Sequence, residues 1–142
     1  MRVEHTDPVY ILEKYIDSEE KAPVLYWIYG GALVVGSNTY EEYGPNIWMD
    51  RDIIVVAVNY RLGALGFLST VSEEIPGNLG HWDQALGLRW VSENIHHFGG
   101  DPGQVTLFGE SAGSLRSALS LVQIPRYTVL SLVESYYACA NN

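Results

Sequence analysis

The fold is decided by one stretch of the sequence, Val105-Thr106-Leu107-Phe108-Gly109-Glu110-Ser111-Ala112-Gly113. Its first four residues make a short apolar run, which predicts a buried strand that ends at Gly109. The last five have the pattern Gly-x-Ser-x-Gly, which is a weak signal when it stands alone. Here the pattern lies between a predicted strand and a predicted helix, which places Ser111 on a sharp, strained turn. This context favours a reactive serine over the alternative, a glycine-rich turn in which the serine has no special part.

Two more apolar runs precede this stretch, at residues 24–29 and 53–60. None of the three runs alternates apolar with polar residues, which is typical of strands that are covered on both faces. Between the second and third runs, apolar residues at helical spacing predict a helix over residues 81–98 that ends at Gly99. The apolar stripe of this helix consists of Leu88, Val91, Ile95 and Phe98. This order predicts an α/β fold with a mainly parallel, doubly wound sheet and flanking helices.

The first apolar run is followed by three small residues, Gly30-Gly31-Ala32. Acyl transfer needs backbone N–H groups that point at the oxygen on which negative charge develops. A small-residue loop at the carboxyl end of a strand, beside the turn that carries Ser111, would supply such groups. A simple tight turn is the alternative. Residues 31–38 have the glycine spacing of a phosphate-binding loop but lack its Lys and Ser/Thr, and no G-x-G-x-x-G occurs.

Composition and charge narrow the class of protein. The 142 residues are 47% hydrophobic, which suits one domain with a proper core and is too apolar for a disordered chain. Seventeen Asp and Glu against eight Lys and Arg give a net charge of -9, so we expect no nucleic-acid partner. Cys139 is the single cysteine, and we predict neither an intrachain disulfide nor a metal site.

The segment most like a membrane span is the uncharged run at residues 22–40. Pro23 and the pair Gly30-Gly31 interrupt it, so we expect a buried strand and a loop, and no membrane span. Residues 1–8 hold no apolar segment, so no signal peptide is predicted, and the localisation stays open. Residues 1–22 as a whole are polar, and we expect them to be irregular.

Several strings in the same order resemble the type-B carboxylesterases, the group within the α/β-hydrolase fold that includes the cholinesterases. The strings are Trp27-Ile28-Tyr29-Gly30-Gly31-Ala32-Leu33 with Gly36-Ser37, Val58-Asn59-Tyr60-Arg61-Leu62-Gly63, Leu65-Gly66-Phe67-Leu68, Gly77-Asn78-Leu79-Gly80, Asp83-Gln84, Trp90-Val91, Asn94-Ile95, Phe98-Gly99-Gly100-Asp101-Pro102 and the stretch 105–113. The resemblance covers residues 23–114, which we interpret as a core fragment of this fold, whereas residues 115–142 form a divergent tail.

The resemblance implies hydrolysis of a small-molecule carboxylic ester through a serine acyl-enzyme, without a cofactor or metal. It implies that Ser111 is the nucleophile and that the oxyanion hole consists of the backbone N–H groups of Gly31, Ala32 and Ala112. Glu110 lies beside the nucleophile and would tune its electrostatics. The other supporting residues that it implies are Gly30, Gly109, Gly113 and a buried structural ion pair between Arg61 and Asp83. Members of this family are often secreted or lie in the endoplasmic reticulum.

The chain departs from the family pattern in three places. Ala32 replaces the usual third glycine of the oxyanion segment, and the family's amino-terminal strands with their cysteine signature are not found before Pro23. The fold orders its triad as Ser, then Asp or Glu, then His, yet residues 112–142 hold one acid, Glu134, and no histidine. The histidines that precede Ser111 are His5, His81, His96 and His97. We therefore expect an inactive fragment of an esterase, without its triad acid and histidine.

Two other hypotheses stay open. The same fold includes non-catalytic adhesion proteins related to the cholinesterases, so a binding module is the main alternative. Such proteins typically depart at the nucleophile, whereas Ser111 and its flanking glycines are intact here. The third hypothesis is a fragment that never folds, because its parallel strands would lose neighbours and expose their edges. The sequence makes no prediction of the oligomeric state.

Overall fold

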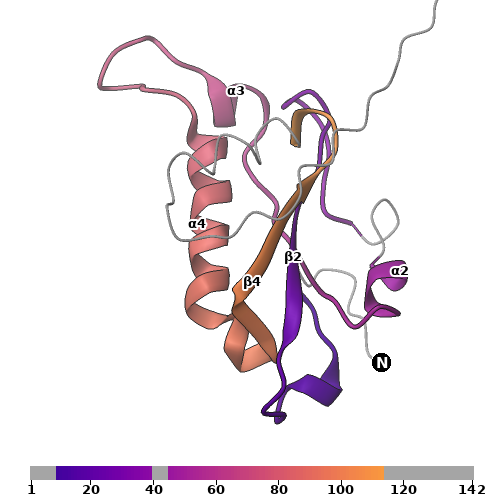
Figure 1. Ribbon diagram of the computed structural model, residues 1–142. Helices are drawn as coiled ribbons and strands as arrows, with labels where there is room; N and C mark the ends of the chain where they lie inside the picture. Colours follow the sequence, from indigo (N-terminus) through magenta and orange to yellow (C-terminus); the bar gives the residue numbers. More distant parts are fainter. Residues whose placement is uncertain (1–8, 40–44, 114–142) are drawn as a thin grey trace, which may run out of the picture.

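The computed structural model describes residues 9–39 and 45–113, which build one twisted sheet with helices on both faces (Figure 1). The four strands lie in the order β1-β3-β2-β4, with β2 at Ala22–Ile28 in the centre. Strands β3 (Ile54–Ala57) and β4 (Gly100–Gly109) both pair with β2 in parallel, and β1 (Val9–Tyr10) pairs with β3 antiparallel. The predicted α/β fold with a mainly parallel sheet is therefore confirmed.

Helices cover the two faces of the sheet unequally. The long helix α4 (Leu79–Asn94) continues into the 3-10 turn η2 (Ile95–Phe98) and packs along one face (Figure 1). The short helix α2 (Asn46–Met49) lies on the other face, where Met49 contributes to a small apolar cluster. The remaining helical elements are η1 (Glu13–Tyr15) and α3 (Gly63–Phe67). In the described ranges, no helix has the length and apolarity needed to cross a membrane.

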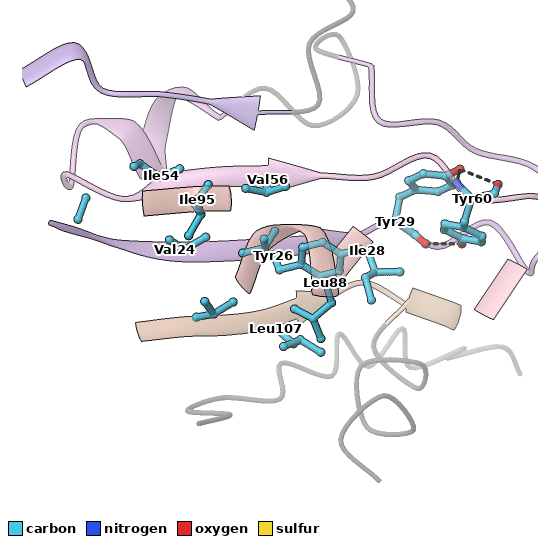
Figure 2. Close-up of a cluster of buried hydrophobic side chains, with 13 residues drawn as sticks. Val24, Tyr26, Ile28, Tyr29, Ile54, Val56, Tyr60, Leu88, Ile95 and Leu107 are labelled. Atoms are coloured by element: carbon cyan, nitrogen blue, oxygen red, sulfur yellow. Dashed lines mark hydrogen bonds between the residues drawn. The ribbon is translucent and has the colours of Figure 1, made fainter. Parts of the chain in front are cut away.

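The main core lies between α4 and the sheet (Figure 2). Leu88, Val91 and Ile95 of the predicted apolar stripe are at most 2% exposed and pack against strand residues such as Val24 and Ile54. The residues buried here are those of the continuous apolar runs and of the helical apolar stripe. Their burial is the main favourable contribution to folding.

A close approach between α4 and the central strand depends on a glycine. A Cβ at Gly87 would lie 2.4 Å from the Tyr26 hydroxyl, which is closer than real Cβ atoms come. That hydroxyl donates a hydrogen bond of 2.8 Å to the backbone carbonyl of Gln84. Gly87 therefore lowers the helix propensity of α4, but it leaves room for the buried Tyr26 hydroxyl to reach the Gln84 carbonyl.

The boundaries of the elements differ from those predicted. The strand predicted over residues 53–60 ends at Ala57, where the carbonyl accepts a hydrogen bond of 2.9 Å from the Asn38 side chain. The strand predicted over 105–108 already begins at Gly100. The segment 1–22, which was expected to be irregular, contributes β1, η1 and the first residue of β2 within its described part. Two-residue strands carry no readable alternation, which explains why β1 escaped prediction.

Candidate active site

Ser111 has the backbone conformation of a strained turn. Its φ is +52°, in the left-handed region that residues other than glycine rarely adopt. Strand β4 ends two residues earlier at Gly109, and Ala112 and Gly113 already have helical structure. The N–H of Gly113 donates a hydrogen bond of 2.8 Å to the Glu110 carbonyl across the turn. This is the strand-to-helix turn that the pentapeptide predicted, and strain of this kind persists only where the surrounding structure enforces it.

The second glycine of the pentapeptide packs against the end of β2. A Cβ at Gly113 would lie 2.1 Å from the Ile28 carbonyl oxygen and 2.9 Å from that of Tyr29. The N–H of Glu110 donates a long hydrogen bond of 3.4 Å to the same Ile28 carbonyl, and Gly109 is in register with Ile28 in the sheet. Gly113 therefore permits the backbone contact that holds the turn against the neighbouring strand.

The loop after β2 passes close to the serine turn. A Cβ built on Gly30 would lie 3.1 Å from Cβ of Ser111, 2.4 Å from Oε2 of Glu110 and 2.8 Å from the Glu110 carbonyl. Gly30 is buried, whereas Ser111 is exposed. The structure thus brings together the two segments that the sequence singled out separately, the glycine pair after β2 and the serine after β4.

Beyond Gly30 the loop makes a tight turn with unusual backbone angles. Three successive residues have positive φ, namely +91° at Gly31, +54° at Ala32 and +66° at Leu33. The N–H groups of Val34 and Val35 donate hydrogen bonds of 3.0 and 3.1 Å to the Gly31 carbonyl. Within residues 9–39 and 45–113, the backbone hydrogen bonds outside helices and strands use no N–H of Gly31, Ala32 or Ala112 as donor. The three proposed oxyanion donors are therefore not consumed by the local turns.

Two buried tyrosines behind the loop were not singled out by the sequence reasoning. The Tyr60 hydroxyl donates a hydrogen bond of 2.7 Å to the Tyr29 carbonyl and lies 3.5 Å from the Gly30 carbonyl. The two rings stack with centroids 4.6 Å apart and planes at 20° (Figure 2). Each tyrosine lies near the end of an apolar run. This position, at the end of a predicted strand, is the signal by which the sequence could have indicated a hydrogen bond to the loop.

The ion pair that the resemblance implied is present, but the prediction that it is buried is wrong. Arg61 Nε and Nη2 bind the two Asp83 carboxylate oxygens at 2.7 and 2.8 Å, and the Arg61 N–H donates to Oδ2 at 3.0 Å. The Arg61 side chain is 48% exposed and that of Asp83 is 25% exposed. The hydrogen bond from the Arg61 side chain, followed by its backbone N–H and charge, lowers the pKa of Asp83 below its usual range.

The other chemically notable residues lie elsewhere. His81 is in α4, with its ring centroid 5.1 Å from that of Phe67. His96 and His97 are exposed in η2, and their ring centroids are 3.8 Å apart. His5, Glu134 and Cys139 fall outside the described residues.

Comparison with known proteins agrees with this arrangement. The sequence model of the carboxylesterase family matches residues 8–129, so the match extends on both sides of the core expected at 23–114. The crystal structure of juvenile hormone esterase from Manduca sexta superposes with a TM-score of 0.72 at 39% identity, over 77% of this chain and 20% of that one. That protein carries covalently attached OTFP.

Curated relatives give the same result. Cholinesterase 1 of Branchiostoma lanceolatum is 56% identical over 94 residues, which is 66% of this chain and 26% of the relative. Esterase B1 of Culex pipiens is 49% identical over 106 residues, which is 73% of this chain and 20% of the relative. The chain thus spans about a fifth to a quarter of the length of these relatives. With its α/β-hydrolase type of sheet, its strained serine turn and a family match over most of its length, this chain belongs to the carboxylesterase family.

Proposed function

We propose that this chain carries the nucleophile and the oxyanion-binding loop of a carboxylic ester hydrolase. The observation that supports this most strongly is the close approach of Gly30 to Ser111, where a Cβ added to Gly30 would lie 3.1 Å from Cβ of a serine whose φ is +52°. Among the described serines, Ser111 is the one with a positive φ, and it lies next to a loop whose Gly31 and Ala32 N–H groups donate no backbone hydrogen bond to another described residue. This combination suits acyl transfer. Covalent attachment of OTFP to the Manduca sexta esterase shows that a relative with this fold forms a covalent adduct.

In the proposed reaction, the Ser111 oxygen attacks the carbonyl carbon of the ester and the carbonyl oxygen becomes an oxyanion. The N–H groups of Gly31, Ala32 and Ala112 donate hydrogen bonds to that oxyanion. The tetrahedral intermediate collapses, the alcohol leaves with a proton, and the acyl group stays on the serine oxygen. Water then attacks the acyl-enzyme and releases the acid.

We also propose that the 142-residue polypeptide does not turn over esters by itself. The serine must lose its proton to a base, and residues 112–142 contain no histidine to follow Ser111 in the family's order. The test is hydrolysis of an activated aryl ester with and without added imidazole, which replaces the missing base. We expect no saturable turnover without imidazole and saturable, imidazole-dependent turnover with it. Ser111→Ala should abolish the rescued rate. Ser92→Ala, which alters a partly buried serine of α4, should leave the rate unchanged.

Two outcomes contradict the proposal in different ways. Saturable turnover without imidazole that Ser111→Ala abolishes would show that the chain has a base of its own. Equal imidazole-dependent rates in the Ser111→Ala variant and the unaltered chain would remove Ser111 from the reaction.

The intact serine turn favours an esterase over a non-catalytic binding module. A binding module has no need of the unfavourable φ at Ser111, which would be relieved by glycine at that position. Reaction with a fluorophosphonate probe in the presence of imidazole, which replaces the missing base, separates the two functions. A well-folded chain that the probe does not modify would favour the binding module.

A further inference from the structure

We propose that Tyr60 is a positioning residue for the oxyanion loop, and that Tyr29 holds it in place. This inference rests on the proposed function, since it assigns a task to residues behind the same site. Both tyrosines belong to the main core, with exposed fractions of 1% for Tyr29 and 5% for Tyr60. They come from different parts of the chain, at the end of β2 and after β3.

The Tyr60 hydroxyl contacts two successive carbonyl groups. Its strong hydrogen bond of 2.7 Å goes to the Tyr29 carbonyl, and the Gly30 carbonyl lies 3.5 Å away. In an extended strand, successive carbonyls point in opposite directions, so one hydroxyl cannot reach both. The contact therefore marks the residue at which the strand ends and fixes the direction in which the loop leaves it.

This contact also determines where the Gly31 N–H points. The Gly30 carbonyl and the Gly31 N–H belong to one planar trans peptide, in which they point in opposite directions. Because the carbonyl faces the buried Tyr60 hydroxyl, the Gly31 N–H must face away from the core. Ser111 lies beside this part of the loop, since a Cβ added to Gly30 would lie 3.1 Å from Cβ of Ser111. The hydroxyl thus orients one of the proposed oxyanion donors from behind.

Tyr29 keeps the Tyr60 ring in the required place. Its ring stacks on that of Tyr60 with a centroid distance of 4.6 Å. Its hydroxyl lies 3.4 Å from the Tyr60 N–H and 3.5 Å from the Tyr60 carbonyl, so each tyrosine contacts the backbone of the other (Figure 2). The loop packs against the Tyr29 ring again at Gly36. A Cβ at Gly36 would lie 2.7 Å from Cδ2 of Tyr29 and 3.2 Å from the Gly30 carbonyl oxygen.

A second tyrosine provides a matched control. The Tyr26 hydroxyl lies in the same core cluster and also donates to a backbone carbonyl, that of Gln84 at 2.8 Å. It has no part in the loop. Tyr60→Phe and Tyr26→Phe each delete one buried hydroxyl and leave one carbonyl without that donor, so we expect similar losses of stability. Only Tyr60→Phe should change the loop.

The sequence offers a direct spectroscopic view of the loop. It contains two Gly-Gly pairs, Gly30-Gly31 and Gly99-Gly100. With glycine labelled by ¹³C at the carbonyl and by ¹⁵N, a spectrum that correlates each N–H with the preceding carbonyl shows only Gly31 and Gly100. The Gly99 carbonyl accepts the Ala22 N–H at 2.9 Å and serves as the internal reference.

We expect Tyr60→Phe to move the Gly30 carbonyl resonance and to change the residual dipolar coupling of the Gly31 N–H, while the Gly99-Gly100 signal stays in place. Tyr26→Phe should leave the Gly30-Gly31 signal unchanged. The imidazole-dependent rate at which a fluorophosphonate modifies Ser111 should fall about tenfold in Tyr60→Phe only, since complete removal of one oxyanion donor costs about 100-fold. If Tyr60→Phe does not fold, incorporation of 3-fluorotyrosine makes the hydroxyl a stronger donor and should shift the Gly30 carbonyl but not that of Gly99.

The results separate this inference from the proposed function. Equal Gly31 changes in both variants, or none in either, would overturn the positioning role. A displaced Gly31 with an unchanged rate of Ser111 modification would make the contact purely structural and would also overturn it. Failure of the probe to modify the unaltered chain in the presence of imidazole would refute the proposed function, and the glycine signals would still decide whether Tyr60 orients the Gly31 peptide.

Discussion

Replacement of Gly113 by alanine is expected to displace the serine turn. The new Cβ would lie 2.1 Å from the Ile28 carbonyl oxygen, whereas ordinary contacts begin at 3.4 Å, so the backbones must separate by 1.3 Å (3.4 minus 2.1). The neighbouring atoms are also backbone, 2.9 Å away in Ile28 and Tyr29, and cannot rotate aside. Alanine gains about 0.5–1 kcal/mol in helix propensity, but overpacking of this kind costs about 1–3 kcal/mol or more. The steric cost dominates.

Two measurements check this prediction. Urea denaturation should show a loss of about 2 kcal/mol in the free energy of unfolding for Gly113→Ala, against little change for Gly103→Ala, where the added Cβ would meet only side-chain atoms of Asp101, the nearest at 3.1 Å. A displacement near 1 Å should slow the imidazole-dependent modification of Ser111 by a fluorophosphonate about 100-fold. A Gly113→Ala chain as stable and as reactive as the unaltered one would refute the claim that this glycine holds the turn against β2.

Three further predictions concern backbone strain at Ala32, the Arg61–Asp83 ion pair and the packing of Gly87. Ala32→Gly should raise the free energy of unfolding by about 0.5–1 kcal/mol, because alanine is strained at a φ of +54°; an unchanged or lower urea midpoint would contradict this. Asp83→Asn should cost about 1 kcal/mol or less near neutral pH, since Arg61 is half exposed. Arg61 lowers the folded-state pKa of Asp83, so this stabilisation is present above the unfolded pKa of about 4 and is lost as the pH falls through the lower folded value; a cost that does not decrease as the pH is lowered below about 4 would argue against the ion pair. Gly87→Ala should destabilise by about 1–3 kcal/mol through the Tyr26 hydroxyl at 2.4 Å, and much less in a Tyr26→Phe background; additive effects in the double-mutant cycle would disprove that contact.

Features encoded by local pattern were predictable from the sequence. The parallel strands and α4 follow from continuous apolar runs and from the helical spacing of residues such as Leu88 and Val91, and both are confirmed. The turn at Ser111 follows from two glycines placed where a strand meets a helix, and its positive φ agrees with that reading. These signals are strong because each depends on neighbours a few residues apart.

Features set by tertiary contact were not predictable. The Tyr29–Tyr60 contact joins residues that are 31 positions apart, and neither residue belongs to a recognisable motif of donors and acceptors. Positive φ at Ala32 and Leu33 escaped notice because non-glycine residues carry no signal for it. The pairing of Arg61 with Asp83 followed from resemblance, but its exposure depends on what packs around it, which no local pattern encodes.

The central claim is that Ser111 is a nucleophile whose side chain is positioned for reaction by its strained backbone conformation. Its most direct test is to incubate the folded chain with a fluorophosphonate in the presence of imidazole, which replaces the missing base, and to locate the adduct by peptide mass spectrometry. We expect one adduct, on Ser111, which forms faster on the folded chain than on the urea-unfolded chain and is absent from Ser111→Ala. Modification spread over several serines, or at the same rate in the folded and unfolded chains, would contradict it.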